Sequence, residues 1–211
     1  MSDYNQTFTV PFLEGDFISN GSEVPQIFSD CKKWPLKQHW SGSQPKELAH
    51  AFIAHNNEGI RFYTWNEEKE PFTTATKNDQ RLWELGSVNE FFVKGIDDSY
   101  WEVHIAPNGL KMDIKIKSAE ALLLKKLPWQ DLIAYESNMS FKTYRGENFW
   151  TVDLLIPWKT FGFNSIPNET WSFSVCRYNY PGKCENSEKS SISDLTELNF
   201  HRVAEFQKIT F

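Results

Sequence analysis

The sequence predicts an all-β protein, an antiparallel β-sandwich or jelly roll with one or two short helices. Its aromatic content of 16% favours strands, because aromatic side chains pack well on pleated surfaces. Tracts in which apolar and polar residues alternate recur along the chain, and this is the period of a strand. Turn residues separate these tracts, for example Pro107-Asn108-Gly109. Roughly eight to eleven short strands divided by turns are typical of two packed antiparallel sheets.

The first half of the chain contains two predicted hairpins. Residues 1–46 carry scattered Gly, Ser and Pro and are expected to be largely irregular. Residues 48–54 and 60–65 flank an Asn-Asn-Glu-Gly turn and form the first hairpin. A strand at 87–94 leads to the second hairpin, 100–105 with 110–116. Alternation predicts one wet face there, with Glu102 and His104, and one buried face, with Trp101, Val103, Ile105, Leu110, Met112, Ile114 and Ile116.

The second half adds strands around two short helical segments. Residues 118–127 have helical composition and stop before a proline. A hairpin follows at 139–144 and 149–156, and residues 157–163 form a single helical turn between Pro157 and Gly162. Strands at 171–180 and 206–211 complete the prediction. No repeat, low-complexity tract or linker divides the chain, so residues 1–211 are expected to form a single domain.

Charge and hydropathy argue against two classes of partner. The net charge is −6 with both signs interspersed, and no basic patch could neutralise phosphates, so a nucleic acid is not expected. No apolar run has the length of a membrane span. No signal peptide is visible, which predicts a cytoplasmic location for the sequence as it stands. A trimmed extracellular chain would look the same, so the compartment stays open, as does the oligomeric state.

An enzyme is not expected. Carboxylate pairs occur at Glu84 and Glu90 and at Asp97 and Asp98, but nothing in the sequence around them raises the pKa of one against the other, as glycoside hydrolysis requires. The sequence also contains no nucleophile elbow, no phosphate-binding loop and no catalytic Cys/His arrangement.

Aromatic and polar residues follow a characteristic order in three segments, 82–109, 149–180 and 199–211. They are Trp83, Glu90, Phe92, Tyr100, Asn108, Gly109, Trp150, Pro157, Trp171, Arg177, Tyr178, Phe200, His201, Glu205 and Phe206. In order and spacing this pattern resembles carbohydrate-binding module family 9 and its single-domain bacterial relatives, within the DOMON-like sandwich superfamily. The match runs from about residue 48 to the end. The resemblance implies a sandwich that binds a mono- or oligosaccharide, free or within a polysaccharide, without catalysis.

The chain departs from the family pattern at the sugar clamp. In the sugar-binding members two Trp side chains clamp a pyranose, one from the segment that matches Trp83 and one from a late loop. The matching late loop, residues 190–201, contains no Trp, and Leu85 and Gly86 occupy a position that is usually acidic. Half of the clamp is missing. The alternative is an interaction or small-ligand module that kept the fold and lost the sugar site.

Trp83 and Glu90 are the leading candidates for a binding site. A pyranose needs a flat ring for its C–H groups and polar side chains for its hydroxyls. Trp83 lies in a polar loop at a strand edge, which suits an exposed platform, although covering the open end of the sandwich explains it equally well. Glu90 and Asn89 alternate with apolar neighbours, so one of them can point outward to sugar hydroxyls or to solvent.

Three further residues complete the candidate carbohydrate site. Trp65 follows the first predicted hairpin and is the candidate for a replacement platform. Lys111 shares the polar face of the second hairpin and could reach a ligand, although such lysines are usually just solvated. Arg177 could contact a sugar oxygen, but a structural pairing with Glu102 or Asp153 is favoured.

Two metal hypotheses follow from the resemblance. Several family members carry structural calcium, and Asp97 and Asp98 offer two carboxylates in a turn, with a solvated turn as the default. The superfamily also contains haem-binding sandwiches with Met and His or Lys as axial ligands. Met112 and His104 lie on facing strands, but alternation predicts that they point to opposite faces, so a shared iron is not expected.

Overall fold

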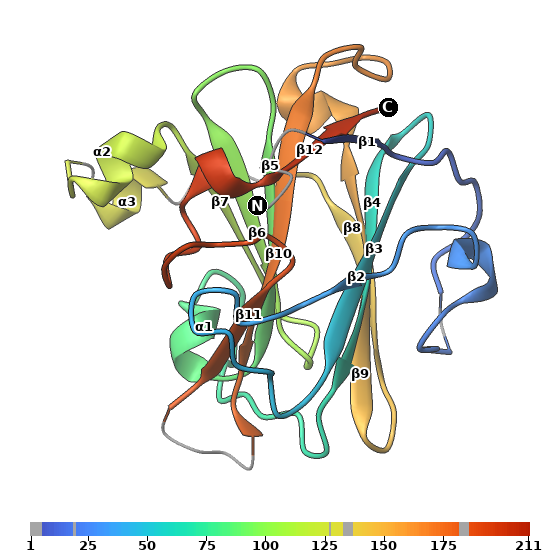
Figure 1. Ribbon diagram of the computed structural model, residues 1–211, viewed down its shortest axis with the longest axis vertical. Helices are drawn as coiled ribbons and strands as arrows, with labels where there is room; N and C mark the ends of the chain where they lie inside the picture. The colour runs from blue at the N-terminus through green and yellow to red at the C-terminus, as the bar shows by residue number, and fades with distance from the viewer. Residues whose placement is uncertain (1–5, 19, 127, 133–136, 182–185) are drawn as a thin grey trace.

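The computed structural model describes residues 6–18, 20–126, 128–132, 137–181 and 186–211. Within these residues two β-sheets pack face to face, which confirms the predicted sandwich (Figure 1). The seven-stranded sheet has the order β1-β12-β10-β5-β6-β7, with β11 paired to β10. The five-stranded sheet has the order β2-β3-β4-β9-β8. All neighbouring strands among them run antiparallel except β1 and β12.

The strands of the seven-stranded sheet are β1 (Thr7–Thr9), β5 (Val88–Lys94), β6 (Tyr100–Ile105), β7 (Lys111–Ile116), β10 (Trp171–Asn179), β11 (Glu188–Ser191) and β12 (Gln207–Thr210). Those of the five-stranded sheet are β2 (Trp34–Pro35), β3 (Ala49–His55), β4 (Gly59–Glu67), β8 (Ser140–Arg145) and β9 (Phe149–Pro157). The α-helices are short: α1 (Leu82–Leu85), α2 (Ala119–Leu123) and α3 (Trp129–Leu132). Single 3₁₀ turns lie at Gln26–Phe28, Trp158–Phe161 and Val203–Glu205.

Local sequence signals explain the predicted elements that the structure confirms. The turn at Trp158–Phe161 begins after Pro157 and ends at Gly162, whose φ of 86° is a left-handed conformation that glycine adopts without strain. Helix α2 begins after Ser118, whose Oγ accepts a hydrogen bond from the Ala121 N–H. Helices α1 and α3 and strands β1, β2 and β11 were not predicted. Strand β11 is polar throughout, so it shows no apolar alternation.

The main core fills the space between the two sheets. Alternate residues of β4, β5 and β10 point into it, including Phe62, Phe91 and Phe173, which are fully buried. The rings of Phe62 and Phe91 lie 5.4 Å apart, and those of Phe62 and Phe173 lie 5.9 Å apart. Contacts of this kind hold the two sheets together across the core.

The structure corrects the predicted faces of the hairpin β6–β7. Cross-strand pairs join His104 to Met112, Glu102 to Ile114 and Tyr100 to Ile116, so these six residues share one face. The apolar residues of β7 therefore lie on the face opposite to that of Trp101, Val103 and Ile105. Alternation predicts the period of each strand, but the register between the two strands is set by the loop of residues 106–110. The face predicted to be wet is also buried, since Tyr100, Glu102 and His104 are at most 5% exposed.

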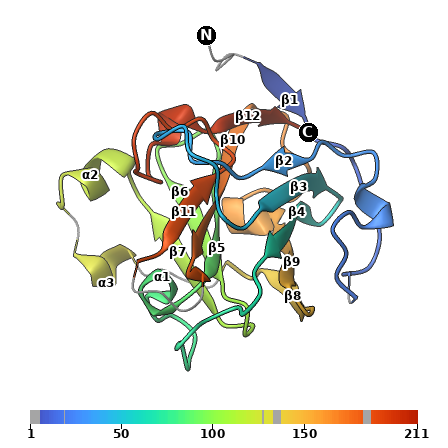
Figure 2. The same cartoon turned by 60° about the horizontal axis from the view of Figure 1, so that its bottom comes forward.

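The outer face of the seven-stranded sheet is called the pocket face below. It carries Glu90, Phe92, Tyr100, Glu102, His104, Met112, Ile114, Ile116, Cys176 and Tyr178. Leu82 of α1 and Leu195, Phe200 and Phe206 of the C-terminal segment pack in the same apolar cluster. Figures 1 and 2 show α1, α2 and α3 on this side of the sandwich.

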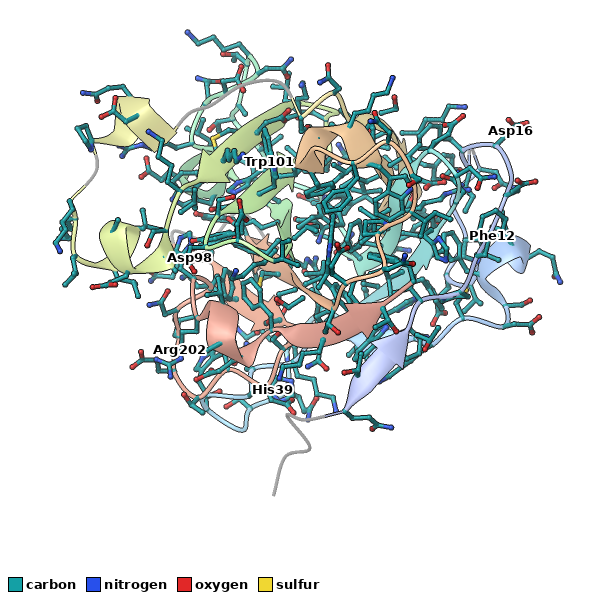
Figure 3. All side chains as sticks on the ribbon, turned by 90° about the horizontal axis from the view of Figure 1, so that it is seen from above. Phe12, Asp16, His39, Asp98, Trp101 and Arg202 are labelled. Atoms are coloured by element: carbon teal, nitrogen blue, oxygen red, sulfur yellow. The ribbon has the colours of Figure 1, made fainter. Side chains whose placement is uncertain are left out.

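The outer face of the five-stranded sheet is covered by the N-terminal segment. Arg61 and Asp153 form a buried ion pair there, with Nη2 to Oδ2 at 2.6 Å and Nε to Oδ1 at 2.9 Å. Arg61 also donates to the backbone oxygens of Gly15 and Asp16, and Asp153 accepts from the Ile18 N–H. Figure 3 shows Phe12 and Asp16 on this side, away from Asp98 and Arg202. In the part of the chain that the structure describes, no helix is long and apolar enough to cross a bilayer.

Candidate functional site

A cavity of about 440 Å³ opens on the pocket face. Glu90 of β5 and Glu102 of β6 contribute polar atoms to it, and Ile114 and Ile116 of β7 contribute apolar ones. The remaining lining residues are Trp83, Leu122, Tyr178, Lys189, Leu198, Asn199, Phe200 and His201. The volume lies within the range of roughly 300–1,000 Å³ that is usual for small-molecule sites. An apolar wall with a few convergent polar groups is the composition that such sites share.

Trp83 is held at the edge of this cavity by the short helix α1. The preceding residue, Leu82, is fully buried. The carbonyl oxygen of Trp83 accepts a 2.6 Å hydrogen bond from the Tyr180 hydroxyl. Gly86 ends the helix where the chain passes close to another segment, because a Cβ on Gly86 would lie 2.3 Å from the Phe72 carbonyl oxygen. The Trp83 ring is half-buried and meets the His104 ring edge to face, with centroids 5.2 Å apart. These contacts fix the ring as a pocket wall.

Two carboxyls and an imidazole adjoin one another at the base of the pocket. Glu90 and His104 are directly opposed on β5 and β6, and Glu102 lies two residues before His104 on the same face. His104 Nε2 lies 2.5 Å from Glu102 Oε1, and His104 Nδ1 lies 3.5 Å from Glu90 Oε1. Beyond them, the Tyr100 hydroxyl lies 2.8 Å from Nδ1 of His201. Polar groups thus continue from the base of the pocket to its rim.

The surroundings move the pKa values of the two carboxyls in opposite directions. Burial, with a smaller contribution from Glu102, raises the pKa of Glu90 to about 8 despite the nearby His104. Burial also raises the pKa of Glu102, but His201 and His104 outweigh it and lower the pKa on balance. For His104, burial lowers the pKa, while Glu90 and Glu102 together raise it above its ordinary value. The sequence pairs Glu90 with Glu84 and predicts no environment that raises the pKa of either; this is wrong for Glu90, because burial on the pocket face raises its pKa and its carboxyl neighbour there is Glu102.

The structure brings Trp83 and Glu90 together and separates Asn89 from them. Glu90 points to the pocket face, whereas Asn89 points between the sheets and is fully buried. Its amide exchanges two 2.9 Å hydrogen bonds with the amide of Asn66 and accepts a third from the Thr64 hydroxyl at 2.8 Å. Asn89 therefore ties the two sheets together and has no access to a ligand in the pocket.

Trp65 and Lys111 also lie away from the pocket. Trp65 is on the outer face of the five-stranded sheet, where its ring stacks between His50 at 5.4 Å and Phe149 at 5.8 Å. Lys111 is on the edge strand β7, and its register with Ile105 places it on the face opposite to the pocket. Its Nζ lies 3.3 Å from Asp113 Oδ2. Neither side chain lines the cavity that holds Trp83.

Arg177 has the structural role that was favoured, but with a different partner. Its guanidinium is 1% exposed and pairs with Glu68 at 3.2 Å, not with Glu102 or Asp153. It also donates to the backbone oxygen of Glu67 at 2.7 Å. Glu102 lies on the opposite face of the sheet, and Asp153 is occupied by Arg61. Arg177 therefore does not reach the pocket.

The metal-binding hypotheses also change. Asp97 and Asp98 are exposed in the turn between β5 and β6, and Ser99 Oγ donates to the Asp97 carboxylate. Among the described residues, the side chains that converge closely enough to hold a metal are Glu90, Glu102 and His104, with ligand atoms within 4.8 Å of one another. The argument that separated Met112 from His104 is wrong, because the two are cross-strand neighbours on the pocket face.

Several pocket residues were not singled out from the sequence as site residues. Glu102 and His104 were read as a solvated strand face, and Lys189 belongs to the unpredicted strand β11. Asn199 comes from the late loop, in which the family pattern predicts a Trp and no polar ligand-binding residue. Tyr178 and Phe200, whose rings meet edge to face at 5.4 Å, belong to the family pattern and line the pocket.

A second cavity, of about 510 Å³, lies beneath the N-terminal segment. It is lined by Glu14, Asp16, Phe17 and Glu58 among others, with Arg61 at its base. The Arg61 guanidinium is already bound by Asp153 and by two backbone oxygens. The cation at the base of this cavity is therefore already paired within the protein.

Comparison with known sequences finds distant mammalian relatives. No protein-family profile matches the chain. The human UPF0462 protein C4orf33 is 25% identical over 141 residues, which cover 67% of this chain and 61% of its own length. The rat homologue is 26% identical over 97 residues, which cover 46% of this chain and 44% of its own length. The chain thus spans about half the length of the curated relatives it matches.

Comparison with solved structures establishes the fold. A candidate carbohydrate-binding protein from Bacteroides uniformis superimposes with a TM-score of 0.74 at 18% identity, over 98% of this chain and 99% of its own. A carbohydrate binding module family 9 domain from Caldicellulosiruptor kristjanssonii, in complex with cellotriose, gives a TM-score of 0.63 at 11% identity, over 97% of this chain and 93% of its own. The same family's domain in complex with glucose gives 0.65 at 12%, over 97% and 95%. The chain therefore has the fold of family 9 carbohydrate-binding modules.

Proposed function

We propose that the protein binds a mono- or oligosaccharide, without catalysis, in the pocket beside Trp83. The observation that carries this proposal is a fixed indole at the edge of a cavity whose base and rim are polar. A pyranose places axial C–H groups against the aromatic wall and its hydroxyls against hydrogen-bonding side chains. The family 9 domains with this fold were solved with glucose and cellotriose, which makes these sugars the first to test.

The pocket supplies both kinds of contact. Trp83 offers the ring, and Glu90, Lys189 and Asn199 offer acceptors and donors at different points of the lining. The late loop has no Trp, but it supplies Leu198, which is 49% exposed, and Phe200. An aliphatic and a phenyl side chain give a weaker apolar wall than an indole does. The affinity for the sugar is therefore expected to depend more strongly on Trp83 than it would in a site with two Trp side chains.

Replacing Trp83 by Ala is expected to raise the dissociation constant for the bound sugar at least about tenfold, which corresponds to about 1.4 kcal/mol. The reason is the loss of the aromatic wall. The measurement is calorimetric titration with glucose, xylose, galactose and cellotriose, accompanied by intrinsic Trp fluorescence. Trp65→Ala is the matched control, because Trp65 stacks on the opposite side of the sandwich and its loss should leave the affinity unchanged.

Equal weakening by Trp65→Ala and Trp83→Ala would contradict the proposal, because it would separate sugar binding from the pocket. Saturable binding of the wild-type protein that survives in Trp83→Ala would contradict it in the same way. If the wild-type protein binds none of the sugars, the sandwich has kept the fold and serves as an interaction or small-ligand module instead.

A further inference from the structure

The base of the pocket contains a histidine with one satisfied and one unsatisfied nitrogen. His104 is 0% exposed. Its Nε2 lies 2.5 Å from Glu102 Oε1, close enough for a charge-assisted hydrogen bond to the carboxylate. Among the described residues, its Nδ1 has no hydrogen-bond partner. A buried polar atom without a partner is rare and destabilising, so the Nδ1 position calls for a ligand.

Glu102 determines what Nδ1 can bind. Because Nε2 donates its proton to Glu102, the neutral imidazole carries a lone pair on Nδ1. Glu90 Oε1 lies 3.5 Å from that nitrogen, and no described residue donates a hydrogen bond to the Glu90 carboxylate. Two groups with lone pairs thus face each other at 97% burial or more, and either a proton on one of them or a metal ion between them makes this arrangement favourable.

The separation of the two atoms favours a metal ion. An N–H···O hydrogen bond spans about 2.7–3.2 Å, so 3.5 Å is too long for a shared proton. Two ligand atoms that lie about 2.0–2.1 Å from a tetrahedral zinc ion are roughly 3.3–3.4 Å apart. The observed separation needs almost no adjustment to hold such an ion.

The surrounding residues provide the arrangement that a bound metal requires. A metal-binding histidine usually donates its second nitrogen to a carboxylate, which fixes the tautomer and the ring orientation. Glu102 occupies this position, and its Oε2 lies 3.8 Å from Nδ1 of His201. The Trp83 ring packs against the His104 ring and limits its rotation. An imidazole ligand with few oxygen ligands suits zinc and its neighbours, whereas calcium takes six to eight oxygens.

We propose that His104 Nδ1 and Glu90 bind a divalent transition metal of the zinc class on the base of the pocket, with Glu102 orienting the imidazole. Glu90 lines the cavity, so the remaining coordination positions of the ion would be open to water or a ligand from that side. The proposal does not depend on sugar binding, because metal binding is measured without a sugar.

The test is a calorimetric titration of chelator-treated protein with Zn²⁺, followed by elemental analysis after gel filtration. One equivalent is expected in the wild-type protein. Glu90→Gln keeps the size of the side chain and removes a ligand, so it should weaken zinc binding at least about tenfold. Glu102→Gln should weaken it about 10- to 100-fold, as is usual for a residue that orients a metal-bound histidine. In Co²⁺-loaded protein, Glu90→Gln should also change the visible absorption spectrum.

His39→Gln is the matched control. His39 Nδ1 also pairs with a carboxylate, Asp194 at 2.8 Å, but no second acidic side chain adjoins it within the described residues, so zinc binding should be unchanged. Near-UV circular dichroism and thermal unfolding confirm that each variant is folded. Absence of zinc binding by the wild-type protein would overturn the proposal, as would equal binding by wild type, Glu90→Gln and His104→Gln.

Discussion

Replacing Glu68 by Ala is expected to lower the free energy of unfolding by about 3–5 kcal/mol, because it leaves the Arg177 charge buried without its partner. Both side chains are 1% exposed. Glu68 Oε2 also accepts from the Trp150 indole at 2.7 Å, and Oε1 accepts from the Ser87 hydroxyl at 2.5 Å. The Glu68 carboxylate, one residue after β4, therefore connects Trp150 of β9, Arg177 of β10 and the residue before β5 at one end of the sandwich. Urea unfolding measures the loss.

Two further variants separate the ion pair from other effects. Glu67→Ala removes the adjacent, half-exposed carboxylate, which accepts one hydrogen bond from the Leu48 N–H, and should cost at most about 1 kcal/mol. Adding Arg177→Met to Glu68→Ala should recover part of the lost stability, because the unpaired charge is removed as well. A Glu68→Ala protein that unfolds at the same urea concentration as Glu67→Ala would contradict this account.

The fold could be predicted from the sequence because burial imposes the alternation. Strands β5, β9 and β10 pack residues such as Phe91, Leu154 and Val175 against the opposite sheet, and this pattern is visible in the sequence. The faces of β6 and β7 could not be predicted, because the register depends on the loop of residues 106–110. Strand β11 was missed because backbone pairing to β10 defines it, and its side chains are polar.

The candidate site could be predicted only in part. Trp83 and Glu90 were found through the family pattern and through the acidic residue in an apolar strand. The sequence predicts that Glu102 and His104 lie on a solvent-exposed face. Alternating polar residues give this same pattern whether water or a distant loop covers them. In the structure, residues between Leu195 and Phe206 help to cover this face, and they lie about a hundred residues further along the chain. Periodicity carries no information on contacts between such distant segments. Arg177 was correctly expected to be structural, but its partner Glu68 lies outside any predicted strand.

Replacing Asp153 by Ala is expected to lower the free energy of unfolding by about 3–5 kcal/mol and also to release the N-terminal segment. Arg61 would lose both of its carboxylate hydrogen bonds while remaining 2% exposed. The Ile18 N–H would lose its acceptor, so the segment that covers the five-stranded sheet would be held less firmly. Urea unfolding measures the first effect. Limited proteolysis measures the second, with cleavage before residue 31 expected to become faster than in the wild-type protein.

Asp16→Ala distinguishes the ion pair from the segment itself. Arg61 bonds only the backbone oxygen of Asp16, which the substitution keeps, and the Asp16 side chain is exposed, so the stability should stay within about 0.5 kcal/mol of wild type. Zinc and sugar binding should survive Asp153→Ala under conditions in which the protein remains folded, because Asp153 and the pocket lie on opposite outer faces of the sandwich. Loss of ligand binding in an Asp153→Ala protein that keeps its secondary structure would contradict this prediction. It would mean that the two outer faces are coupled through the core and that the pocket is not an independent site.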